Sequence, residues 1–144
     1  MDTAFEFDMT LDANGVMLFR FSGVFDVDKW VDQQRAAAVR LFGSKIDPTR
    51  PAVVDLRAFI PPQGDWTKIA KLVLARSQSL GETRKRCALI TGGNFCIDLA
   101  CRFYILSKTF MSRSKCDTRT FCTIEEGYAW AAETFVTPVP SRLH

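Results

Sequence analysis

The sequence contains one histidine, His144, and it is the last residue of the chain. A Ser-His-Asp triad, a Cys-His dyad or a histidine-rich zinc site needs an imidazole held in place, and a chain end rarely provides one. The five cysteines include no C-x-x-C pair, and their spacing does not suit a cysteine-only zinc site. We therefore predict a non-catalytic protein without a metal ion or cofactor. An enzyme using Asp55, Asp65 or a cysteine is the alternative, although nothing in the sequence orients such a group.

Three further features are missing. No window approaches 18 consecutive apolar residues, which argues against a transmembrane helix. The first residues are acidic and form no secretory leader, so we expect a cytoplasmic protein. Neither the G-x-G-x-x-G nor the G-x-x-x-x-G-K-[ST] motif is present, so no nucleotide fingerprint exists. An odd number of cysteines fits reduced thiols, and we expect most of them to pack as small buried side chains.

The composition is that of a globular domain. The chain has 144 residues, of which 47% are hydrophobic and 24% are charged. This length suits a single domain with one core. We expect that domain to span residues 1–135 and to be followed by a flexible tail, 136–144, which contains Pro138 and Pro140.

The N-terminal segment has the pattern of a β-hairpin. Apolar and polar side chains alternate from Phe5 to Leu11, which predicts a half-buried strand. Asn14 and Gly15 follow, and both accept the positive φ of a tight hairpin turn. A return strand is expected from Val16 to Gly23.

Helices and strands alternate along the rest of the chain. Helices are expected from Asp26 or Asp28 to Phe42, over Trp66–Leu80 with Asp65 as the N-cap, over Phe95–Met111, and from Thr123 to about Phe135. Strands are expected over Pro51–Arg57, Cys87–Thr91 and Thr118–Thr123, with a loop over 58–65. The order β-β-α-β-α-β-α-β-α predicts a single α/β domain whose mixed sheet carries an N-terminal antiparallel hairpin.

Three segments of this pattern resemble the STAS fold, and most closely its SpoIIAA-like branch of STAS/SEC14-type domains. They are LDANGVMLFRFSGVFDVDKW (11–30), VVDLR (53–57) and TIEEGYAWAAE (123–133). The resemblance covers roughly residues 5–135. It implies a lipid-binding, ligand-binding or membrane-associating module rather than an enzyme.

The sequence departs from the STAS pattern at one functional position. STAS antagonists of anti-sigma factors carry a phosphorylatable serine after the loop that follows the third strand. The corresponding stretch here, 61–66, has no serine, and Thr67 is the nearest hydroxyl. A phosphoserine switch is therefore not expected.

Two loops that leave the carboxyl ends of predicted strands form the first candidate site. Ligands of open α/β sheets gather at this edge. Apolar walls with a few polar anchors are typical of small-molecule pockets, although the same aromatic side chains could simply fold the loop onto the core. Likewise, Asn94 after two glycines could help hold an anion or could simply cap the helix. The candidate residues for a ligand or membrane loop are Arg57, Phe59, Ile60, Trp66, Asn94 and Phe95.

The helix predicted over 95–111 is apolar around most of its circumference and needs cover beyond one sheet face. A neighbouring helix, a second subunit or a lipid surface could provide that cover. The candidate interface residues are Leu99, Phe103, Tyr104, Leu106 and Phe110.

Basic residues surround this helix. The segment 84–119 holds eight basic and two acidic side chains. That charge fits an anionic membrane surface, although a solvated basic face without a partner fits equally. No nucleic-acid-binding motif is present, and no nucleic acid partner is expected.

We predict a binding or regulatory domain for an apolar or amphipathic small molecule, or for an anionic membrane surface with peripheral attachment. The alternative is a STAS-type interaction module that docks a protein partner or forms a homodimer.

Overall fold

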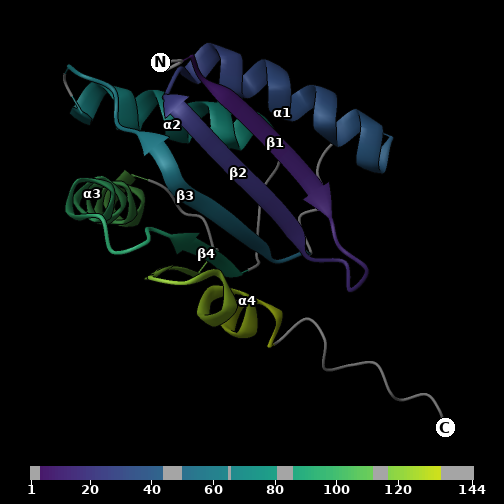
Figure 1. The fold of residues 1–144 in the computed structure, drawn as a ribbon. Helices are drawn as coiled ribbons and strands as arrows, with labels where there is room; N and C mark the ends of the chain where they lie inside the picture. The colour runs from purple at the N-terminus through teal and green to yellow at the C-terminus, as the bar shows by residue number, and fades with distance from the viewer. Residues whose placement is uncertain (1–3, 44–49, 65, 81–85, 112–116, 134–144) are drawn as a thin grey trace, which may run out of the picture.

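A computed structural model describes residues 4–43, 50–64, 66–80, 86–111 and 117–133. The side chains of 77–80 and 107–111 are not described. The elements follow the predicted order (Figure 1). They are β1 (Glu6–Leu11), β2 (Met17–Val24), α1 (Val27–Phe42), β3 (Ala52–Ile60), α2 (Trp66–Leu80), β4 (Arg86–Ile90), α3 (Phe95–Met111), β5 (Asp117–Phe121) and α4 (Ile124–Ala132).

The strands form one mixed sheet in the order β1-β2-β3-β4-β5. β1 and β2 pair antiparallel, and each later pair is parallel. The α/β class and the N-terminal hairpin are thus confirmed. The domain boundary at residue 135 and the tail 136–144 lie outside the described residues, as does Asp65, the predicted N-cap of α2.

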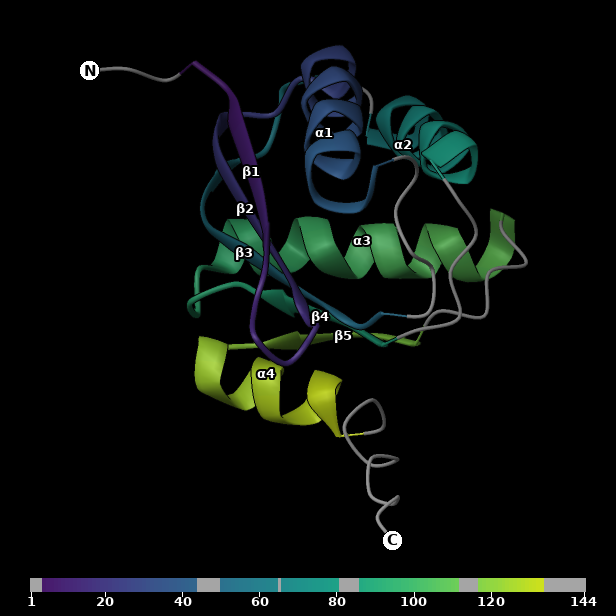
Figure 2. The ribbon, with the colours of Figure 1, turned by 90° about the vertical axis from the view of Figure 1, so that its right-hand side faces the viewer.

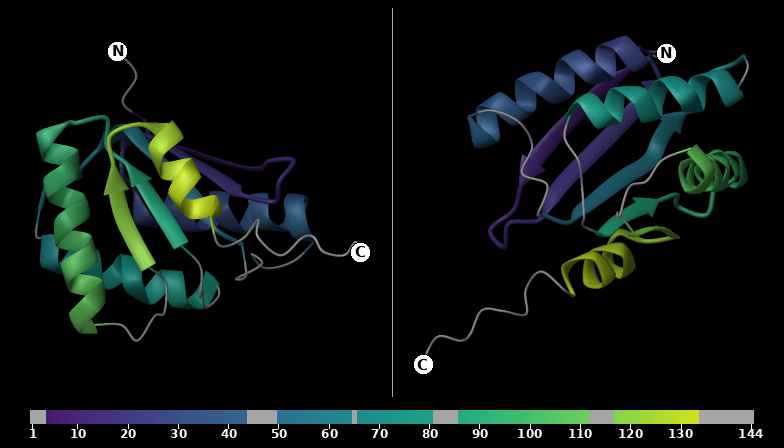
Figure 3. Two further views of the ribbon diagram at one scale, coloured as in Figure 1. Left: turned by 90° about the horizontal axis from the view of Figure 1, so that it is seen from below. Right: turned by 180° about the vertical axis from the view of Figure 1, so that it is seen from behind.

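Helices cover both faces of the sheet. α1, α2 and α3 lie on one face and α4 lies on the other (Figures 2 and 3). The larger core joins Trp30 of α1 and Ile97 of α3 to Val54 and Leu89 of the sheet. On the second face, α4 packs over β3, β4 and β5. Asp8 of β1 and Arg20 of β2, which lie opposite each other on that face, are exposed.

The hairpin turn is wider than its sequence predicts. Only Gly15 has a positive φ, 84°, whereas Asn14 does not. The Gly15 N–H donates to the Asp12 carbonyl at 3.0 Å, and the Asp12 side chain accepts from the N–H groups of Asn14 and Val16 at 2.9 Å each. Asp12 therefore organises a longer turn, because its carboxylate satisfies two backbone donors of the loop.

Local capping signals set the limits of α1 and α4. Asp26 accepts a hydrogen bond from the Lys29 N–H, and Gly43 ends α1 in the left-handed region at φ 79°. Thr123 accepts from the Glu126 N–H at 3.2 Å, so this N-cap is confirmed.

β3 extends three residues further than predicted, to Ile60. Phe59 and Ile60 belong to this strand and pair with Gly23 and Val24 of β2, so they are not in a loop. The register between β2 and β3 shifts by one residue near Arg57, as in a β-bulge. The strand continues because β2 extends beside it, and the prolines at 61 and 62 end it.

Candidate functional site

The predicted aromatic residues at the carboxyl edge belong to two separate groups. The Phe59 ring packs against Phe25 at 5.6 Å and Phe21 at 6.2 Å between ring centroids, next to the core. The Trp66 ring contacts Phe103 of α3 at 6.1 Å, and its Nε1–H donates to the Pro62 carbonyl at 3.2 Å. Phe59 and Trp66 thus secure the β3–α2 connection to different neighbours.

Three apolar residues at this edge are exposed to solvent. Ile60 at the end of β3 is 41% exposed, as is Val24 beside it at 40%. Phe95, the first residue of α3, is 76% exposed. Among the three aromatic residues predicted for this site, Phe59 and Trp66 are half-buried and only Phe95 is exposed.

Arg57 is held by a neighbouring carboxylate. Its Nε and Nη2 donate to the two oxygens of Asp55 at 2.9 and 3.0 Å, and its side chain covers Gly92. Partial burial raises the pKa of Asp55, but the hydrogen bonds from Arg57 and the charge of Arg20 outweigh it, so the pKa lies below its usual value. A Cβ at Gly92 would lie 2.9 Å from Cγ of Arg57, so the close approach depends on glycine.

Asn94 caps α3. Its side-chain oxygen accepts from the Ile97 N–H at 3.0 Å, and the Gly93 N–H before it donates to the Thr91 hydroxyl at 3.3 Å. Gly92 and Gly93 have positive φ values of 68° and 79°, as this tight turn requires. The turn thus uses its own polar groups, which supports the structural role of Asn94.

An apolar ridge runs along the outer side of α3. We define it as Phe95, Leu99 and Leu106, which are 76%, 47% and 56% exposed. Arg102 lies on the same side, because positions 95, 99, 102 and 106 fall within roughly 60° of helix circumference. Its guanidinium is exposed and binds Asp98 at 2.7 Å.

Two of the other predicted interface residues lie on the inner sides of α3. Phe103 is half-buried against Trp66, and Tyr104 is also half-buried. Ile97 and Cys101 are buried against the sheet. The side chain of Phe110 lies outside the described ones. Thus α2 covers part of the apolar circumference of α3, and the ridge remains uncovered within the described structure.

The four described cysteines are less buried than expected, and Cys116 lies outside the described residues. Cys101 is buried and Cys87 half-buried, whereas Cys96 and Cys122 are exposed. Burial raises the pKa of the Cys101 thiol to about 12, with a further contribution from Asp98. Among the described residues, no group of three or more His, Cys, Asp or Glu side chains could hold a metal ion.

Two clusters had no signal in the sequence. In the first, the guanidinium groups of Arg86 and Arg119 lie 4.8 and 5.0 Å from the ring centroid of Trp130. Arg86 also donates to Glu133 at 2.7 Å and to the Trp130 carbonyl at 2.8 Å. This cluster fixes α4 to β4 and β5, and it holds two of the basic groups of the segment 84–119.

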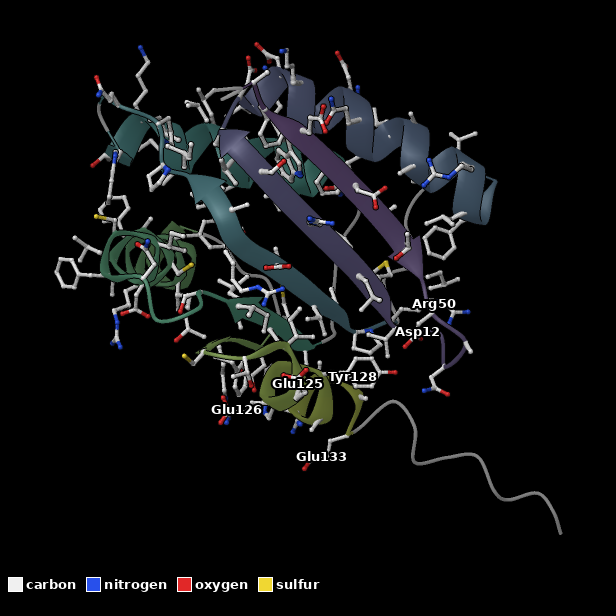
Figure 4. The ribbon with its side chains drawn as sticks, viewed as in Figure 1. Asp12, Arg50, Glu125, Glu126, Tyr128 and Glu133 are labelled. Carbon is white, nitrogen blue, oxygen red and sulfur yellow. The ribbon has the colours of Figure 1, made fainter. Side chains whose placement is uncertain are left out.

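The second cluster joins the hairpin to α4. The Tyr128 hydroxyl donates to Asp12 at 2.5 Å and accepts from the Asn14 side chain at 3.0 Å (Figure 4). The hydrogen bond to Asp12 raises the pKa of Tyr128. Residues more than 110 positions apart create this contact, so no local pattern could have predicted it.

The sheet order, the hairpin and the single helix on the second face define a SpoIIAA-like fold. A crystal structure of an uncharacterised protein of the DUF3478 family with a SpoIIAA-like fold, from Shewanella loihica PV-4, has the same architecture. The two chains superpose with a TM-score of 0.61 over 91% of this chain and 98% of the other, at 14% identity. Neither a protein-family model nor a curated protein sequence matches this chain. The predicted STAS-type fold is therefore confirmed. At this identity the match shows a shared fold and nothing about function.

The described helices set one limit on any membrane contact. None of them combines the length and the apolar character needed to cross a bilayer.

Proposed function

We propose that this protein is a non-catalytic binding domain that docks peripherally on an anionic membrane surface through α3. The observation that carries the proposal is the ridge of Phe95, Leu99 and Leu106, with Arg102 on the same side of the helix. A helix that lies in the membrane interface inserts its apolar side chains and places its basic groups among the headgroups.

Charge favours an anionic lipid surface as the occupant of this face. Arg102 lies on the same side of α3 as the ridge, and the sequence has five further basic residues within 84–119 besides Arg86 and Arg119, which contact Trp130 on the α4 side. Each basic group near an anionic surface contributes about 1 kcal/mol. Since α3 has 17 residues, its axis is about 25 Å long and can lie along the surface.

The small-molecule alternative has less support. Phe59 and Trp66, which were expected to line a pocket, pack against Phe25 and Phe103. Binding of an apolar or amphipathic ligand at the carboxyl edge stays a prediction, with Ile60 and Phe95 as its exposed apolar residues.

Vesicle co-sedimentation tests the proposal. Phosphatidylcholine vesicles containing phosphatidylserine should recover the protein, and pure phosphatidylcholine vesicles should not. The double variant Phe95→Ser, Leu99→Ser should weaken binding at least about tenfold, because it removes two inserting side chains. The matched control is Val39→Ser on α1, where a 59% exposed valine lies away from the ridge.

Two results would contradict the proposal. Equal recovery by neutral and anionic vesicles would remove the electrostatic contribution. A stable dimer in light scattering, abolished by the double variant and accompanied by no vesicle binding, would show that a second copy covers the ridge.

A further inference from the structure

The two edge strands of the sheet differ in how their backbone is protected. At β1, the Phe7 N–H donates to the Gln33 side chain at 2.8 Å, and the Met9 carbonyl accepts from Arg40 at 2.9 Å. Both partners come from α1. An unpaired strand edge is a template for further strands. Gln33 and Arg40 occupy two of the backbone groups of β1 that a further strand would need, and so they protect this edge.

The β5 edge has no such closure at its centre. The Phe121 carbonyl accepts from the Thr91 N–H at 2.9 Å and so points toward β4. Since successive residues of a strand direct their backbone groups to opposite sides, the N–H and carbonyl of Thr120 point away from β4. Among the described residues, nothing hydrogen-bonds to these two groups.

An open depression follows this edge. It is lined by Ile105, Leu106 and Arg102 of α3 and by Arg119 and Thr120 of β5. Arg119 faces Trp130 on the α4 side, whereas Thr120 pairs with Leu89, which belongs to the core on the α3 side. Because residues from both sides of β5 line it, the depression runs along the exposed edge of the strand.

We propose that β5 accepts an extended, acidic segment of a partner protein as an additional strand. The backbone of that segment pairs with Thr120, and its apolar side chains contact Ile105 and Leu106. Its carboxylates bind Arg102 and Arg119, whose side chains are 70% and 59% exposed. Each guanidinium has five N–H donors and can bind a second carboxylate besides Asp98 or Asp117.

Charge favours a foreign acidic segment over a second copy of this chain. Pairing of two β5 edges brings Arg102 and Arg119 of both copies into one seam. Like charges placed opposite one another across strands destabilise the pairing. An alternating peptide of glutamate and valine supplies the opposite charge and the apolar side chains together.

The experiment measures the fluorescence anisotropy of that labelled glutamate–valine peptide. A lysine–valine peptide of the same length is the charge control, and a copy N-methylated at every residue is the backbone control, because it has no backbone N–H to donate along either edge. The wild-type protein should bind the acidic peptide at least about tenfold more tightly than either control.

Protein variants test the same edge. Thr120→Pro removes the outward N–H and leaves the β4–β5 hydrogen bonds intact, so peptide affinity should fall about tenfold. Thr120→Val keeps that N–H and should bind as the wild type does. Vesicle binding should be unchanged in Thr120→Pro, because Thr120 does not belong to the ridge.

Three results would overturn the proposal. Equal binding of the N-methylated and unmodified peptides by the wild-type protein overturns strand addition, even if Thr120→Pro fails to fold. Equal binding of the lysine–valine peptide overturns the choice of an acidic partner. A doubling of mass that competes with the peptide would assign the edge to a second copy of the chain.

Discussion

Single side chains connect parts of this molecule that are far apart in the sequence. Tyr128 of α4 binds Asp12 of the hairpin, and Asp12 in turn accepts from the N–H groups of Asn14 and Val16. Burial raises the pKa of Asp12, but the hydrogen bonds from Tyr128 and the loop backbone outweigh it. The pKa of Asp12 in the folded protein is therefore below its usual value, and its ionised form stabilises the fold.

Tyr128→Phe is expected to lower the free energy of unfolding by about 1 kcal/mol at neutral pH, because it removes one hydrogen bond to a carboxylate. The contribution of Asp12 is present above its unfolded pKa of about 4 and is lost as the pH falls through the lower folded pKa. The difference between wild type and Tyr128→Phe should therefore shrink below about pH 4. Urea unfolding at several pH values measures it.

A double-mutant cycle with Asp12→Asn provides the control. Coupling between the two positions is expected at pH 7. Strict additivity of the two substitutions would show that the hydrogen bond between Tyr128 and Asp12 does not contribute to stability.

At the scale of elements, α4 reaches β4 through a glycine. A Cβ at Gly127 would clash with Cδ1 of Ile90 and lie 3.2 Å from Cβ of Ala88. Both neighbours are fully buried, so they have little room to move. The absence of a side chain at Gly127 therefore sets how closely α4 packs on the sheet.

Gly127→Ala is expected to destabilise the protein by about 1 kcal/mol. Overpacking costs about 1–3 kcal/mol, and the better helix propensity of alanine offsets about 1 kcal/mol of it. Thermal unfolding measures the change, and Ala129→Gly on the exposed side of α4 is the control for propensity alone. A rise in the melting temperature of Gly127→Ala would show that the contact with β4 relaxes without cost.

The elements that the sequence predicted correctly are those with local signals. Asp26 marks the start of α1 and Gly43 marks its end, each through a hydrogen bond with a nearby backbone group. Thr123 marks the start of α4 in the same way. The length of β3 depends instead on β2 beside it, and the side of α3 that stays uncovered depends on where α2 packs. The sequence therefore predicted that α3 is apolar around most of its circumference. It did not predict that Phe95, Leu99 and Leu106 are the residues that stay exposed.

At the scale of the whole molecule, the closed β1 edge should keep the sheet from growing. The double variant Gln33→Ala, Arg40→Ala removes the hydrogen bonds from α1 to the Phe7 N–H and the Met9 carbonyl, so both backbone groups lose their partners. An open edge promotes association between chains. Light scattering should therefore show larger, concentration-dependent particles for this variant than for the wild type.

The matched control for this prediction is Arg35→Ala, which removes an exposed side chain from the same helix. Particle size that does not differ between the double variant and Arg35→Ala would mean that Gln33 and Arg40 do not protect the edge.

The sheet order also has a consequence for how the chain is made. Because each strand pairs with the one before it, a ribosome releases every strand after its partner, and the sheet can grow in the order of synthesis. α4 is the exception in timing, since it covers Val53, Ala88 and Ile90 only after all five strands have emerged. A nascent chain that stops before α4 therefore presents this apolar surface to chaperones.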